Sequence, residues 1–202
     1  KDWEKAVSSK DIDAVVIAVP TGLQDYRPAL YGGVAALEMD AFGTRRTPLA
    51  VDPDALSARL VVCYTGAPRQ SGINNWDITK RRIDGDATVV AAFDDIVAAT
   101  ARMRAALEAG DWPGAGRALA DEWTTRTRLA PGVSTPEIDA LLSAAGAAGA
   151  WAGKVCGAGG GGCVFALTPP DHADAVRAAW RSAGARVLDA RVETRGLEVH
   201  TS

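Results

Sequence analysis

The stretch Gly153–Leu167, GKVCGAGGGGCVFAL, decides the fold. Five of the six residues from Gly157 to Gly162 are glycine, and a short apolar segment flanks them on each side. Glycine loses more conformational freedom on folding than any other residue. So dense a run therefore indicates either backbone conformations that a Cβ forbids or a very close approach to another group. Loops with several free N–H groups are typical of sites for phosphate and other anions.

The context of the glycines separates this loop from the common nucleotide-binding loops. Gly157, Gly159 and Gly162 satisfy G-x-G-x-x-G, but that fingerprint follows a strand and opens a helix. Here the apolar run Cys163–Leu167 is closed by Thr-Pro-Pro, which predicts a second strand. The Gly-Lys-Ser/Thr ending of a P-loop is also missing from this stretch. The sequence predicts a strand, a glycine loop and a strand, and it leaves open a tight turn that binds nothing.

The same residues carry a resemblance to a known family. Lys154–Leu167 resembles the third, C-terminal motif of the GHMP kinases, the superfamily of galactokinase, homoserine kinase, mevalonate kinase and phosphomevalonate kinase. The preceding Glu122–Gly153 is similar to sugar kinases close to D-glycero-D-manno-heptose 7-phosphate kinase. The resemblance covers most of the chain from Val15 to Leu167. It implies an enzyme that uses ATP and Mg²⁺ to phosphorylate a hydroxyl of a sugar or sugar phosphate.

Composition limits the classes of protein to consider. A chain of 202 residues with 48% hydrophobic content holds one good-sized domain, or one domain and part of another. The net charge of −3 argues against nucleic acid as a partner. Three cysteines without metal-type spacing favour a reduced, cytoplasmic setting. No apolar run reaches membrane-spanning length, so no membrane partner is expected.

Hydrophobic periodicity and turn residues predict the order of elements from Leu60 onward: strand, three helices, strand, glycine loop, strand, helix, strand. Without the extra helices this is the split βαββαβ, ferredoxin-like pattern, a four-stranded antiparallel sheet with helices on one face. The clearest predicted elements are strands at 60–64, 163–167 and 186–192, and helices at 86–109, from 111, from the Ser134-x-x-Glu137 capping signal, and at 171–183. Residues 66–76 are expected to form a polar loop.

Before Leu60 the sequence predicts fewer elements. An apolar run at 14–19 is either a buried strand or the end of a helix, a helix from Asp25 ends at Gly32-Gly33, and 34–39 reads as a strand. Residues 41–58 lack periodicity and are expected to connect two lobes. The predicted fold is α+β. Residues 51–202 form a ferredoxin-like C-terminal lobe, and residues 1–50 are the rear part of an N-terminal α+β lobe.

Asp25 is the candidate catalytic residue. In the family, a Gly-x-x-Asp-Gln segment supplies a carboxylate beside the substrate hydroxyl, and Gly22, Gln24 and Asp25 occupy the matching positions here. Tyr26 stands where the family has Gln, so the identity of the substrate stays open. Phosphoryl transfer needs a carboxylate that orients the hydroxyl or takes its proton. The alternative is that Asp25 only caps the helix.

Four further polar side chains are candidate contacts for substrate or phosphate. Related kinases begin the segment after the 60–64 strand with Thr-Gly and follow it with Arg and Ser, which points to Arg69 and Ser71. The family's basic, Trp-led tract points to Arg126 and Arg128, since arginine suits a planar anion. In each case the alternative is a solvated surface residue.

The glycine loop itself is the last part of the expected site. Gly157, Ala158, Gly159, Gly160, Gly161 and Gly162 are expected to shape the active-site cleft, with backbone N–H groups directed at the substrate or the transferred phosphate.

Two expected motifs have no match in the chain. The family's Gly-Leu-Gly-Ser-Ser-type phosphate loop and its early sugar-binding segment are both absent from these residues, and no Mg²⁺ ligand can be assigned. A missing N-terminal lobe of the same protein is therefore an expected partner, and this fragment alone is expected to be inactive. Two alternatives remain open, a non-catalytic ferredoxin-like ligand-binding or regulatory module and a GHMP kinase for a non-sugar alcohol such as mevalonate.

Overall fold

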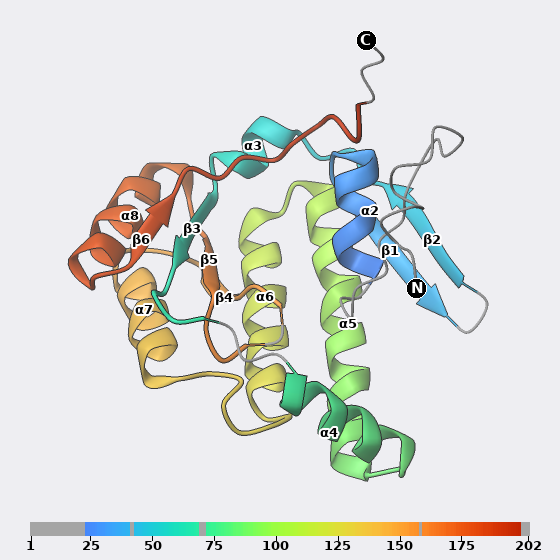
Figure 1. Cartoon of the computed structure of the whole chain (residues 1–202). Coiled ribbons are helices and arrows are strands. Elements are labelled where there is room, and N and C mark those ends of the chain that lie inside the picture. Colours follow the sequence, from blue (N-terminus) through green and yellow to red (C-terminus); the bar gives the residue numbers. More distant parts are fainter. Residues whose placement is uncertain (1–22, 41–42, 69–71, 158, 199–202) are drawn as a thin grey trace, which may run out of the picture.

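The computed structural model describes residues 23–40, 43–68, 72–157 and 159–198, with the backbone alone at 23–26, 40 and 72–75. Figure 1 shows a central sheet with helices on both sides, and a smaller unit of one helix and one hairpin that lies beyond the long helix α5. The apolar run at 14–19 lies outside the described residues.

The larger sheet has the topology predicted for a ferredoxin-like lobe. Its strands are β3 (Leu60–Tyr64), β4 (Ala152–Val155), β5 (Cys163–Leu167) and β6 (Arg186–Leu188), in the order β4-β5-β3-β6. Every neighbouring pair is antiparallel. Numbered along the chain the order is 2-3-1-4, the arrangement of a split βαββαβ unit. The α+β, ferredoxin-like prediction is confirmed.

One face of the sheet packs on α7 (Pro136–Ala147) and α8 (Ala173–Ser182). Alternate strand residues point to this side, and they are buried with side chains from both helices. The tightest point is Trp180, whose side chain is fully buried and whose Nε1 donates a hydrogen bond to the carbonyl oxygen of Leu141 at 2.7 Å. A buried indole N–H needs such a partner, so this contact fixes α8 against α7.

The other face of the sheet packs on the extra helices α5 (Ala87–Ala109) and α6 (Trp112–Thr127), whereas the two helices of the βαββαβ unit share one face as expected. Leu60, Phe165 and Leu167 point to this side and share a cluster with residues of both helices. The reason is visible in the strands: LVVCY and CVFAL are apolar at every position, which suits strands covered on both faces. The two helices lie side by side, as Figure 1 shows.

The ends of α5 and α6 follow local signals that the sequence displays. Asp86 caps α5 through hydrogen bonds from the N–H groups of Thr88 and Val89, and Gly110 ends it at φ +69°. Asp111 then caps α6. The cap of α7 is Thr135, whose hydroxyl accepts from the Ile138 N–H, one residue later than the Ser134 signal implied.

The smaller unit consists of α2 (Leu23–Tyr31), β1 (Ala35–Asp40) and β2 (Gly43–Pro48). α2 and β1 were predicted, whereas β2 and the short helix α3 (Pro53–Ser57) lie in the stretch expected to be a connection. β2 is polar and has no alternating apolar pattern that would predict a strand. It is a strand because it pairs with β1.

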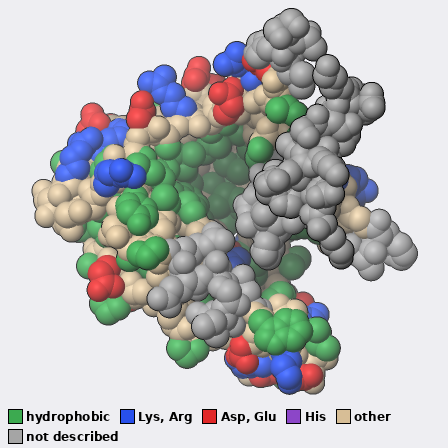
Figure 2. All heavy atoms as spheres, viewed as in Figure 1, with side chains coloured by type: hydrophobic (Ala, Val, Ile, Leu, Met, Phe, Trp, Pro, Cys, Tyr) green, Lys and Arg blue, Asp and Glu red, His purple; other side chains and the backbone are tan. Residues whose placement is uncertain are grey.

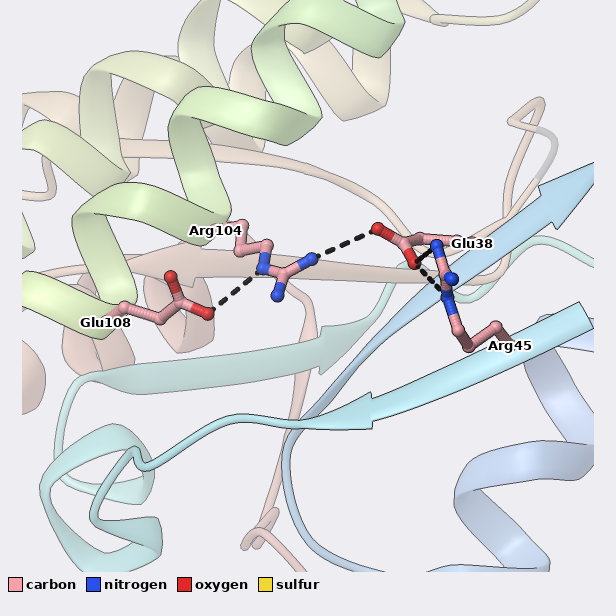
Figure 3. Close-up of polar contacts among 4 residues, drawn as sticks. All are labelled: Glu38, Arg45, Arg104 and Glu108. Atoms are coloured by element: carbon pink, nitrogen blue, oxygen red, sulfur yellow. Dashed lines mark hydrogen bonds and ion pairs between the residues drawn. The ribbon is translucent and has the colours of Figure 1, made fainter.

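Two sets of contacts join the smaller unit to the rest. Figure 3 shows Glu38 of β1 between Arg45 of β2 and Arg104 of α5, with a nitrogen–oxygen distance of 3.2 Å to Arg104. Arg104 also pairs with Glu108 on its own helix. These are exposed ion pairs, which position the hairpin more than they stabilise it.

The second set is the C-terminal tail, residues 189–198. The N–H of Gly33 donates to the carbonyl of Glu193 at 2.7 Å, and the N–H of Leu197 donates to the carbonyl of Leu30 at 3.1 Å. The predicted strand 186–192 ends early, at Leu188, because the N–H of Val192 bonds the Ser57 hydroxyl instead of a strand.

The helix α4 (Gly72–Ile83) occupies the second half of the predicted polar loop 66–76, so that prediction was wrong from Gly72 on. Its Ile78 is buried in a cluster with Val89 and Leu129. In the described residues, no helix is both long and apolar enough to cross a membrane.

Candidate functional site

The glycine loop joins β4 to β5 as predicted. Gly157, Gly159, Gly160, Gly161 and Gly162 all have φ between +75° and +141°. Residues with a Cβ rarely adopt such angles, so the density of glycine follows from the backbone path. Ala158 lies outside the described residues.

The inner side of the loop is filled by other parts of the backbone. A Cβ at Gly159 would collide with the carbonyl oxygen of Val133, and one at Gly161 would come within 2.9 Å of the carbonyl oxygen of Pro68. The N–H of Gly160 donates to the Val133 carbonyl at 3.1 Å, and that of Gly162 donates to the Ala67 carbonyl at 2.9 Å. The loop thus locks together the segments that precede α7 and follow β3.

Because of this packing, two of the loop N–H groups that were expected to face the substrate or phosphate bond the protein backbone instead. The N–H groups of Gly160 and Gly162 serve the fold and are not available to a ligand. Gly159 and Gly161 are buried, whereas Gly157 is exposed at the start of the loop. Within the described part of the loop, Gly157 is exposed and Gly160 and Gly162 are half-buried.

Beside Gly157 lies an open pocket of about 390 Å³, on the face of the sheet that α5 and α6 cover. Its walls come from α5, α6, β4 and β5, and it is lined chiefly by apolar residues with three charged side chains, Glu122, Arg126 and Lys154. In the orientation of Figure 1, Figure 2 shows hydrophobic side chains gathered in a hollow of the surface. Mostly apolar walls with a few polar groups are typical of small-molecule sites.

The three charged groups form one network. Glu122 Oε1 pairs with Arg126 at 2.5 Å and its Oε2 pairs with Lys154 at 2.5 Å. The side chains of Glu122 and Lys154 are 11% and 15% exposed. Burial, followed by the positive charge of Arg126, lowers the pKa of the Lys154 ammonium below its ordinary value, although Glu122 acts in the opposite direction.

Residues 103–186, which include most of this pocket and the whole glycine loop, match the family described as "GHMP kinases C terminal". This part of the chain is similar to the C-terminal region of the GHMP kinases.

Curated GHMP kinases match beyond that segment. A galactokinase from Mycobacterium tuberculosis is 30% identical over 217 residues, which cover 90% of this chain and 59% of the relative. A D-glycero-alpha-D-manno-heptose 7-phosphate kinase from Campylobacter jejuni is 26% identical over 175 residues, covering 84% of this chain and 50% of the relative. The chain thus spans little more than half the length of the curated relatives it matches.

Among solved structures, L. major mevalonate kinase in complex with R-mevalonate superposes with a TM-score of 0.69 at 21% identity. The match covers 82% of this chain and 50% of that chain. At this identity the superposition is evidence for the fold alone, and it is consistent with the ferredoxin-like topology of the larger sheet.

Several residues expected at a GHMP kinase site fall where the structure gives little detail. The backbones of Gln24 and Asp25 lie in the first turn of α2, while their side chains are outside the described part of the chain. Gly22, Arg69 and Ser71 are also outside it. Their roles therefore remain predictions.

The two arginines of the Trp-led tract are described, and they differ. Arg126 lines the pocket and contacts Glu122, whereas Arg128 is the exposed C-cap residue of α6 and is not among the pocket residues. The structure brings Arg126 and Gly157 together at one pocket, and Arg128 does not line it.

Sequence reasoning missed Lys154 and Glu122. A signal for Lys154 was present, since a lysine inside an apolar strand next to the glycine loop has to find a partner when buried. Glu122 stands four residues before Arg126, the spacing of a helical ion pair. No local signal connects Glu122 to Lys154, which are 32 residues apart.

The described residues do not form a recognisable Mg²⁺ site. In the described residues, no group of three or more His, Cys, Asp or Glu side chains lies close enough to hold a metal ion. No step of the chemistry is therefore assigned to a metal held by this chain.

Proposed function

We propose that this chain is part of an ATP- and Mg²⁺-dependent kinase that transfers the γ-phosphoryl group to a hydroxyl of a sugar or sugar phosphate. The observation that carries the proposal is the pocket beside the glycine loop of a GHMP C-terminal lobe, with Arg126 and Lys154 facing it. The match to a galactokinase over 90% of this chain supports the same class of acceptor.

In the proposed reaction the acceptor hydroxyl oxygen attacks the γ-phosphorus of ATP, the bond to the β–γ bridging oxygen breaks, and ADP leaves. Asp25 accepts the proton that the hydroxyl loses. The glycine loop keeps the pocket walls in place, because its packing on the segments around Val133 and Ala67 fixes the ends of β4 and β5. Residues 1–50 are proposed to belong to the N-terminal lobe and 51–202 to the C-terminal domain.

The test is a screen of ATP consumption by the protein at its natural length. Hexoses, heptoses and their phosphates are offered as acceptors, with mevalonate and homoserine as contrasts. Phosphorylation of a sugar or sugar phosphate supports the proposal. Turnover of mevalonate or homoserine alone would replace the proposed acceptor class, and the absence of ATP-dependent turnover with every acceptor would refute a kinase.

The role of Asp25 is tested with Asp25→Asn in the same protein. The amide has the same shape but cannot take the proton, so the transfer rate should fall by about 10²–10⁴-fold while the melting temperature stays close to that of the parent. An unchanged rate with a lower melting temperature would make Asp25 a helix cap.

A further inference from the structure

Among the described residues, the network Glu122–Arg126–Lys154 has one more positive than negative charge. Two cations share a single carboxylate, which leaves one net positive charge in a largely apolar pocket. Among the residues that the structure describes, Glu122 is the acidic group in contact with either cation. Uncompensated charge is costly away from water, so such a site favours an additional anion.

Within the described part of the chain, the donors of the two cations are only partly used. Arg126 directs Nε and Nη2 at Glu122 Oε1, which leaves Nη1, and Lys154 directs its Nζ at Oε2, which leaves two of its three N–H donors. Because both groups contact one carboxylate, they lie close enough together for one small anion to reach both. Phosphate, with several acceptor oxygens, suits a guanidinium and an ammonium placed in this way.

The place of the network in the pocket indicates what carries the anion. Lys154 is two residues before Cys156 and three before Gly157, and all three line the same cavity. The volume of about 390 Å³ lies within the range of small-molecule sites and exceeds what a single phosphate group fills. Apolar residues such as Met103 and Phe165 line the rest of the cavity.

We propose that Lys154 and Arg126 bind the phosphate group of a phosphorylated acceptor in this pocket, in competition with the Glu122 carboxylate. The inference rests on the proposed function and makes it narrower: the acceptor is a phosphate monoester, not a neutral sugar. The free energy of anion binding comes from hydrogen bonds between charged groups, of which Lys154 is largely buried. The lowered pKa of Lys154 agrees with this, since an anion at the site would favour its charged form.

The test measures binding without requiring turnover. Inorganic phosphate, glucose 6-phosphate and glucose are titrated by calorimetry into the natural-length protein at constant ionic strength, with and without saturating AMPPNP. Phosphate and glucose 6-phosphate should bind, compete with each other and persist when AMPPNP fills the nucleotide site, whereas glucose should not displace phosphate.

The variants separate an anion site from a structural ion network. Lys154→Met and Arg126→Met should each weaken phosphate binding at least about tenfold. Glu122→Gln removes the competing carboxylate at nearly constant shape and should strengthen phosphate binding about tenfold. Lys80→Met is the matched control: it removes a lysine from an exposed ion pair with Asp84 on α4 and should leave phosphate affinity unchanged.

Folding is monitored separately, because removing one member of a buried network can destabilise the protein. Thermal melts with and without phosphate show whether each variant is folded, and phosphate should raise the melting temperature of the parent and of Glu122→Gln. If Lys154→Met does not fold, the phosphate affinity of Glu122→Gln still tests the inference. Weaker or equal phosphate binding by folded Glu122→Gln would overturn the inference.

Phosphate that is displaced by AMPPNP and insensitive to Lys154→Met would place the anion at the nucleotide, which also overturns the inference. Its failure is distinguishable from failure of the proposed function. A protein that phosphorylates neutral sugars but does not bind phosphate esters keeps the function and loses the inference. A protein that binds phosphate at Lys154 but phosphorylates no acceptor loses the function.

Discussion

Replacing Gly159 by alanine adds one methyl group at the most tightly packed point of the glycine loop. The residue has φ +99°, and the added Cβ would lie 2.9 Å from Val133 Cα and 3.0 Å from its carbonyl carbon, with the carbonyl oxygen nearer still. These are backbone atoms, which cannot rotate away as a side chain would. Relief requires the segment before α7 to move, and that segment also accepts the Gly160 hydrogen bond.

The cost has two parts. A residue with a Cβ in the left-handed region costs about 1–2 kcal/mol, and overpacking in a filled site adds about 1–3 kcal/mol. The expected loss in the free energy of unfolding is therefore about 2–5 kcal/mol. Gly110→Ala is the matched control, because Gly110 has φ +69° and no atom within 4 Å of its added Cβ. It should cost only the first part.

The assay is chemical denaturation of both variants and the parent, followed by tryptophan fluorescence from the six tryptophans of the chain. Gly159→Ala should unfold at a clearly lower denaturant concentration than Gly110→Ala. If the two variants lose the same free energy within about 0.5 kcal/mol, the close packing of the loop on Val133 contributes nothing and the reasoning fails.

Four shorter predictions test other parts of the structure. Thr135→Ala should lower the free energy of unfolding by about 1 kcal/mol through loss of the α7 cap, and denaturation curves as stable as the parent's would place the cap elsewhere. Trp180→Phe removes a buried hydrogen bond and part of a filled core, so it should cost about 2–4 kcal/mol by the same measurement; a loss below 1 kcal/mol would contradict the described contact. Burial raises the pKa of the Cys63 thiol to about 12, so a thiol reagent should modify exposed Cys156 in the native protein and Cys63 only after unfolding; native labelling of Cys63, read by mass spectrometry, would refute this. Hydrogen bonds from Arg81 and from backbone N–H groups hold the pKa of Asp86 below its usual range, so its contribution is present above the ordinary aspartate pKa and is lost as the pH falls through the lowered value; the gap in melting temperature between the parent and Asp86→Asn should therefore shrink on acidification, and a gap that widens would show the opposite linkage.

The parts of the fold that the sequence predicted are those set by local chemistry. The glycine loop needs left-handed angles wherever it is placed, and Asp86, Gly110 and Asp111 mark helix ends through bonds to residues two to four positions away. Short continuous apolar runs bounded by turn residues were enough to place β3 and β5. These features are confirmed because their causes lie within a few residues of each feature.

The parts that were missed depend on distant partners. β2 is a strand because β1 pairs with it. β6 stops at Leu188 because the chain then leaves the sheet and the Val192 N–H donates to the Ser57 hydroxyl. The same reason explains the candidate site. Arg126 was predicted from its own tract, whereas its connection to Lys154 through Glu122 exists only after α6 packs on β4.

The C-terminal tail has a consequence for synthesis of the chain on the ribosome. The N–H of Gly33 donates to the carbonyl of Glu193, and the carbonyl of Leu30 accepts from the Leu197 N–H. The hydrogen-bond partners of the end of α2 are therefore synthesised about 160 residues after α2 itself. At translation rates of about 5–20 residues per second this delay is roughly 8–30 s. During that interval the nascent helix and hairpin must be held by other contacts, so arrested chains that stop before Glu193 should leave the end of α2 open to protease. Completion of the tail is thus the event that closes this edge of the protein.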